Sequence, residues 1–77
     1  MNEIGEVARA REWVRTGRAQ RIRRAADVSL SEIANHLGVS KATVHRWESG
    51  HCAPRANVAV RYVHLLDQLR RRSRRAA

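Results

Sequence analysis

Residues 29–50 read SLSEIANHLGVSKATVHRWESG, and this stretch decides the fold. Ser29 and Glu32 have the spacing of a capping box, in which each residue satisfies a free backbone N–H of the other at the start of a helix. Helices often end with a glycine in the left-handed conformation, and Gly38 is a candidate for such an end. The pattern therefore predicts a helix between Ser29 and Gly38, with an apolar face of Leu30, Ile33, Ala34 and Leu37.

A second helix is predicted directly after the first. Only Val39 separates Gly38 from Ser40, which has the residue type that caps a helix, and Gly50 ends the pattern. The second helix should run over Lys41–Ser49. Ala34 is small enough for the two helices to cross closely, and Val39 and Val44 are expected to fix the angle between them. The sequence thus predicts a helix–short turn–helix unit.

The predicted helix 41–49 has two different faces. At about 100° per residue, Val44 and Trp47 fall on one side. An arc of about 140° on the other side holds small residues, a histidine and two cations. Such a surface fits the major groove of DNA. An ordinary solvated helix face can have the same composition, so that alternative stays open. The arc comprises Lys41, Ala42, His45, Arg46 and Ser49.

The charge of the chain favours a polyanionic partner. Its 77 residues carry 16 Lys and Arg against 7 Asp and Glu, a formal net charge of +9, and fifteen of the basic residues are arginine. Arginine presents a planar fork of donors that matches phosphate and the guanine edge. Nucleic acid is therefore the favoured partner, although genome composition is an alternative source of the arginines in the C-terminal run.

Cysteine and histidine usage argues against metal and catalytic chemistry. Cys52 is the one cysteine, so no intramolecular disulfide can form, as in cytoplasmic proteins. His36, His45, His51 and Cys52 lack the regular spacing of a zinc site. We predict no metal, no cofactor and no enzymatic activity. The chain also has no apolar run long enough to span a membrane and no signal-peptide pattern.

Two further helices are predicted before the central unit. The first covers Glu3–Val14, where Asn2 is a candidate cap, and Thr16-Gly17 ends it. The second covers Arg18–Ala26, with an inward face of Ala19, Ile22 and Ala26. The inward face of the first is expected to comprise Ile4, Val7, Ala8 and Val14.

The last helix is predicted from about Arg55 to Arg70 or beyond, because Pro54 suits a helix N-terminus. Residues 70–77 form a basic tail that either extends this helix or is disordered until phosphates order it. Its apolar arc is wide; either all of it faces the core, or Leu65 and Leu69 meet the first helix or a second subunit.

The predicted fold is all-α, a compact bundle of about five helices in a single domain, 1–77, in which 1–16 is a helical extension.

The central region resembles the Cro/repressor (Xre-type) helix-turn-helix family over residues 18–66. The resemblance rests on the Ile33-Ala34 pair, the Leu37-Gly38-Val39-Ser40 turn, the Trp47-Glu48-Ser49-Gly50 ending and the following Pro54. It implies a lambda-repressor-like fold. Two departures stand out: Leu30 replaces a common DNA-contacting glutamine, and the usual separate fifth helix, with its dimer surface, is missing.

The resemblance also implies roles for matching residues. Arg23 and Glu48 match an ion pair that ties the recognition helix to an earlier helix. The family resemblance and the outward arc of helix 41–49 together indicate which residues read bases: Lys41, Ala42, His45 and Arg46. The residues expected to contact phosphate are Arg18, Ser29, Ser31, Ser40, Thr43, Ser49, His51, Arg55, Arg71 and Arg72. Those expected to be structural are Arg23, Ala34, Gly38, Val44, Trp47 and Glu48.

These features predict a cytoplasmic, nucleoid-associated transcriptional regulator, in particular a repressor, that binds double-stranded DNA; whether it binds as a homodimer is left open. Two alternatives remain open. One is an antitoxin that binds a toxin through the N-terminal helix and also binds its own promoter. The other is an architectural protein of the phage excisionase type.

Overall fold

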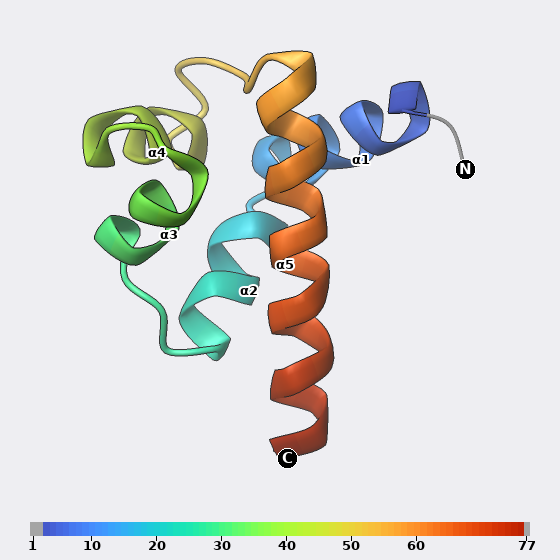
Figure 1. The fold of residues 1–77 in the computed structure, drawn as a ribbon, viewed down its shortest axis with the longest axis vertical. Helices are drawn as coiled ribbons and strands as arrows, with labels where there is room; N and C mark the ends of the chain where they lie inside the picture. The colour runs from blue at the N-terminus through green and yellow to red at the C-terminus, as the bar shows by residue number, and fades with distance from the viewer. Residues whose placement is uncertain (1–2, 77) are drawn as a thin grey trace.

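The computed structural model describes the backbone of residues 3–76 and the side chains of residues 3–73. This part of the chain folds into five helices and contains no strand (Figure 1). The all-helical prediction is confirmed; the proposed Asn2 cap lies outside the described residues. The helices are α1 (Glu3–Arg15), α2 (Arg18–Ala25), α3 (Leu30–Leu37), α4 (Lys41–Glu48) and α5 (Ala56–Ala76).

The start of α3 contains the capping box that its sequence predicts. The Glu32 backbone N–H donates to Ser29 Oγ at 3.0 Å, and the Ser29 N–H donates to Glu32 Oε1 at 2.9 Å. The bond from the Ser29 N–H holds the pKa of the Glu32 carboxyl below its usual range. These reciprocal bonds fix the residue at which α3 begins.

The turn between α3 and α4 is set by local hydrogen bonds. Gly38 has φ +73°, a left-handed conformation, and it lets the Val39 N–H donate back to the Ala34 carbonyl at 3.0 Å. Two residues later Ser40 Oγ accepts from the Thr43 N–H at 3.1 Å and caps α4. The turn is therefore short, and α4 starts in a fixed direction relative to α3.

The chain between α2 and α3 turns at Asp27, a non-glycine residue with φ +58°. Its backbone bonds resemble those at Gly38, because the Val28 N–H donates to the Arg23 carbonyl at 3.2 Å. A Cβ strains this conformation, and Asp27 follows the C-terminal end of α2, where the helix dipole is negative.

Replacing Asp27 with glycine should therefore raise the free energy of unfolding by about 0.5–1 kcal/mol. Gly38→Ala makes the opposite change at a site where an added Cβ meets no atom within 4 Å. It should lower the stability by about 1–2 kcal/mol through backbone strain alone. Urea unfolding of both variants would test these two predictions. Equal changes in stability of the same sign would contradict them.

One apolar core joins all five helices, and α5, the long vertical helix in Figure 1, packs against α1, α2 and α3. Ala59, Tyr62, Val63 and Leu66 of α5 are buried in it, and the Tyr62 ring lies 5.0 Å from the Trp47 ring of α4. Leu65 and Leu69 are half-buried against the same core. The other buried apolar residues are Val7, Ala10, Trp13, Val14, Ala19, Ile22, Ile33, Ala34, Leu37 and Val44.

The predicted inward face of α1 was partly wrong. Ile4 is 81% exposed and Ala8 is also exposed, whereas Ala10 and Trp13 are buried. At about 100° per residue, Ala10 and Trp13 shift the centre of the buried face away from both misassigned residues. The large indole of Trp13 decides which side of α1 packs inward.

The basic C-terminal residues continue α5 as a helix to Ala76. Asp67 lies just before them and pairs with Arg70 at 2.7 Å and Arg71 at 3.0 Å, and Arg9 of α1 lies 3.8 Å away. The hydrogen bond from Arg70 lowers the pKa of the Asp67 carboxyl. One carboxylate thus offsets part of the positive charge at the start of the basic run.

Candidate nucleic-acid interface

Helix α4 is anchored by one face and open on the other. Val44 is completely buried and Trp47 is 4% exposed, and both pack into the common core. The four side chains predicted to read bases lie on the opposite side and are all exposed: Lys41, Ala42, His45 and Arg46. The structure thus brings this set together on one continuous surface of a rigidly held helix.

A buried ion pair ties α4 to α2. Arg23 Nε lies 2.7 Å from Glu48 Oε2, and Arg23 Nη2 lies 2.9 Å from Oε1, so the contact is bidentate. Arg23 Nη1 also donates to the Val28 carbonyl at 2.9 Å. The Glu48 side chain is only 2% exposed, and its hydrogen bond raises the pKa of Arg23. Burial, with the Glu48 carboxylate adding to it, raises the pKa of the neighbouring Tyr62 phenol.

The segment that follows α4 is held at both ends. Gly50 has φ +79°, which lets the His51 N–H donate back to the Arg46 carbonyl at 3.0 Å. At the other end Pro54 is fully buried, and its carbonyl accepts a bond from Arg11 Nε of α1 at 3.4 Å. The predicted phosphate contacts Ser49, His51 and Arg55 are all exposed on this segment.

The predicted hydroxyl contacts lie at the starts of α3 and α4. Ser29, Ser31 and Ser40 are exposed, so each can meet solvent or a ligand. Thr43 is half-buried, and its Oγ1 lies 2.8 Å from Ser40 Oγ. Both helix N-termini present partial positive charge beside these hydroxyls, an arrangement that suits phosphate oxygens.

Three predicted phosphate contacts lie elsewhere. The Arg18 guanidinium is 5.0 Å from the Trp13 ring centre, and Arg18 lines a groove between α2 and the far part of α5. Arg71 pairs with Asp67, and Arg72 lines a neighbouring groove beside α2. Because α5 has 21 residues and starts beside the loop after α4 (Figure 1), it carries Arg71 and Arg72 about 20 Å or more from that loop. Their contact with phosphate stays a prediction.

Sequence reasoning missed a brace between α5 and α3. The guanidinium of Arg61 donates to the carbonyls of His36 at 3.1 Å and Leu37 at 3.2 Å, which are free carbonyls at the end of α3. Arg61 therefore holds the helix-turn-helix unit against the core. No local pattern reveals it, because the partners are far apart in the sequence.

The described part of the chain contains neither a metal cluster nor a membrane-spanning helix. No group of three or more His, Cys, Asp or Glu side chains in it could hold a metal ion. Of its helices, none combines the length and the apolar character that crossing a bilayer requires.

Comparison with known proteins agrees with this geometry. A family model described as a helix-turn-helix domain matches residues 16–77, which include α2 to α5. No curated protein and no solved structure gives a significant match. The matched region begins just after α1, so α1 is an addition to the part that the family model describes.

Proposed function

Because the chain belongs to the family of helix-turn-helix domains, we propose that it is a sequence-specific DNA-binding transcriptional regulator that inserts α4 into the major groove. One observation carries the proposal. The exposed face of α4 holds Lys41, His45 and Arg46 around the small Ala42, while its other face is fixed in the core. A helix of this shape can enter the groove deeply and present donors to base edges.

The proposed readout follows from the chemistry of these side chains. Arg46 is long and exposed and can donate two parallel bonds to guanine O6 and N7, and Lys41 can donate to the same atoms. Ala42 leaves room for the groove floor and can contact a thymine methyl group. His45 offers a ring nitrogen whose role depends on its tautomer.

Phosphate contacts on either side of α4 would set its position in the groove. On one side stand the N-terminal ends of α3 and α4 with Ser29, Ser31 and Ser40. On the other side stands the loop with Ser49, His51 and Arg55, directly before α5. Backbone hydrogen bonds hold both groups, through the caps of α3 and α4 and through the His51 N–H bond to Arg46.

The finer part of the proposal is repression by a homodimer. A domain of this type occupies about one half-site, so a dimer would protect an inverted repeat. Selection of bound sequences from random DNA tests this directly. An inverted repeat with centres about 10 base pairs apart would support a dimer, a single half-site would support a monomer, and no enriched sequence would contradict specific recognition.

Arg46→Ala should weaken binding to the selected site by about 1–3 kcal/mol and relax base preference at one or two positions. Affinity for scrambled DNA should change much less, because the lost contact is to a base. Arg21→Ala is a matched control, since it removes the same charge from an exposed position of α2 that lines the α2–α5 groove. If Arg46→Ala weakens both DNAs by the same factor, Arg46 contacts phosphate and the base-reading assignment fails.

A further inference from the structure

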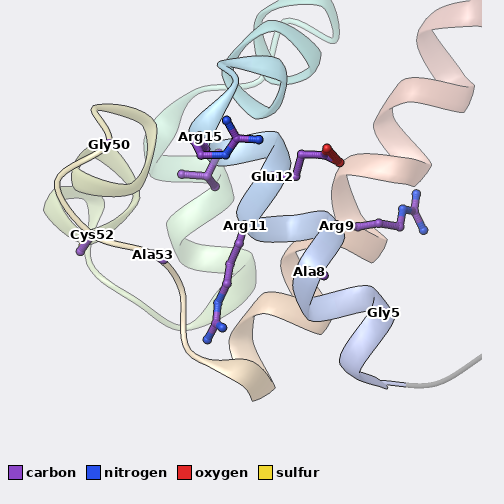
Figure 2. A pocket seen from close by; sticks show the side chains of 10 residues that line it. Gly5, Ala8, Arg9, Arg11, Glu12, Arg15, Gly50, Cys52 and Ala53 are labelled. Atoms are coloured by element: carbon purple, nitrogen blue, oxygen red, sulfur yellow. The ribbon is translucent and has the colours of Figure 1, made fainter.

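Helix α1 lies beside the loop that follows α4, and an open hollow separates them. Gly50, Cys52 and Ala53 form the loop side of this hollow, and Arg11 and Arg15 are among the α1 residues that line the other. Figure 2 shows Arg11 reaching from α1 toward the loop segment, whereas Arg9 and Glu12, which also line the hollow, point away from that segment. The loop is thus flanked by two arginines from a helix outside the family match.

Both arginines are available to an external anion. Arg11 and Arg15 are exposed, and neither has a carboxylate partner among residues 3–73. The bond from Arg11 Nε to Pro54 holds the side chain at the loop, and both of its terminal nitrogens remain without a partner in that part of the chain. Arg9 differs, because it pairs with Glu6 and Asp67.

The two arginines continue the proposed DNA surface. The exposed arc of α4 ends at Ser49, and the loop residue His51 and then Arg55 extend the positive and polar surface toward α5. Arg11 and Arg15 lie across the hollow from this same loop. A DNA strand that contacts the loop would therefore bring its next phosphates toward the α1 side.

We propose that α1 supplies a second set of phosphate contacts, in which Arg11 and Arg15 bind the DNA backbone just beyond the loop 49–55. This inference rests on the proposed function, since it takes α4 to lie in the major groove. Guanidinium groups suit this role because their planar donors match phosphate oxygens and stay charged at all relevant pH values. The contacts would lengthen the bound region at one edge of each half-site and would add no sequence preference.

Arg15→Ala provides the main test, because the Arg15 side chain is exposed and makes no hydrogen bond or ion pair within residues 3–73. Removing one phosphate contact should lower the slope of log affinity against log salt by about 0.9, so the affinity loss from 50 to 200 mM salt should shrink about 3.5-fold. Selected and random DNA should be affected alike. Arg15→Lys should restore most of the slope, and an Arg11→Ala, Arg15→Ala double variant should lower it by about 1.8.

Arg21→Ala is again the matched control, and its slope should stay close to that of the parent protein. Hydroxyl-radical footprints of Arg15→Ala should lose protection at one edge only. If the slopes of Arg15→Ala and the parent agree, the α1 contact is absent and an acidic protein segment becomes the better partner for this face. If Arg21→Ala lowers the slope equally, the slope reports net charge and not a contact at α1, and the proposal fails. Failure of the proposed function would be seen separately, as a parent protein that binds selected and random DNA equally.

Discussion

A Glu48→Ala variant should be less stable than the parent protein by about 3 kcal/mol. Glu48 is almost completely buried, and both of its carboxylate oxygens accept bonds from Arg23. Removing the carboxylate leaves the Arg23 guanidinium, whose side chain is only 11% exposed, with its charge unpaired inside the protein. The loss of stability therefore comes mainly from the buried Arg23 charge that is left unpaired. The intact ion pair itself contributes less than this to the free energy of unfolding.

A double-mutant cycle would measure this coupling. Arg23→Ala should cost a similar amount, and the double variant should lose much less than the sum of the two single changes. Glu12→Ala serves as a control, because it removes an exposed carboxylate that makes no ion pair within residues 3–73 and should leave the melting temperature unchanged. Purely additive losses would show that the Arg23–Glu48 pair contributes nothing as a pair.

DNA binding gives this variant a second expected result. Since the pair ties the last turn of α4 to α2, its loss should loosen the α4 surface. Binding to selected DNA should weaken even at temperatures where the variant is still folded, and random DNA should be less affected. This outcome would separate a positioning role from a direct contact, because Glu48 is too buried to touch DNA itself.

Those parts of the fold that depend on neighbouring residues could be predicted from the sequence. The Ser29–Glu32 capping box, the left-handed Gly38 and the Ser40 cap each act over a few residues, so the pattern of residue types was sufficient. The exposed face of α4 also followed from helical periodicity. The Arg23–Glu48 contact was different, because its residues are far apart and only the family resemblance indicated the pairing.

Other features depend on tertiary packing and could not be predicted. Ile4 was assigned inward because periodicity alone cannot locate the partner of α1, which is mainly α5 (Figure 1). The position of Arg11 and Arg15 beside the loop after α4 depends on that same packing. Likewise, Arg71 was expected on phosphate, and its pairing with Asp67 became visible only once α5 continued as a helix.

The N-terminal helix should be required for folding, although the family model begins at residue 16. Trp13 is 6% exposed in the core, and the guanidinium groups of Arg9 and Arg18 lie 4.9 and 5.0 Å from its ring centre. Trp13→Ala should cost about 3–5 kcal/mol, because it removes a large buried side chain and leaves a cavity between α1 and the other helices. For a chain this short, that is most of the stability a small domain usually has.

The expected measurement is a fall in melting temperature of roughly 12 °C or more, with the helical circular dichroism signal lost at 37 °C. Arg15→Ala on the same helix is the matched control and should melt close to the parent protein, since Arg15 is exposed. DNA binding by Trp13→Ala should fail with unfolding and recover on cooling into the folded range. If Trp13→Ala instead melts like the parent while α1 becomes accessible to protease, residues 16–77 fold without α1, and the helix is an attached segment that the core does not require.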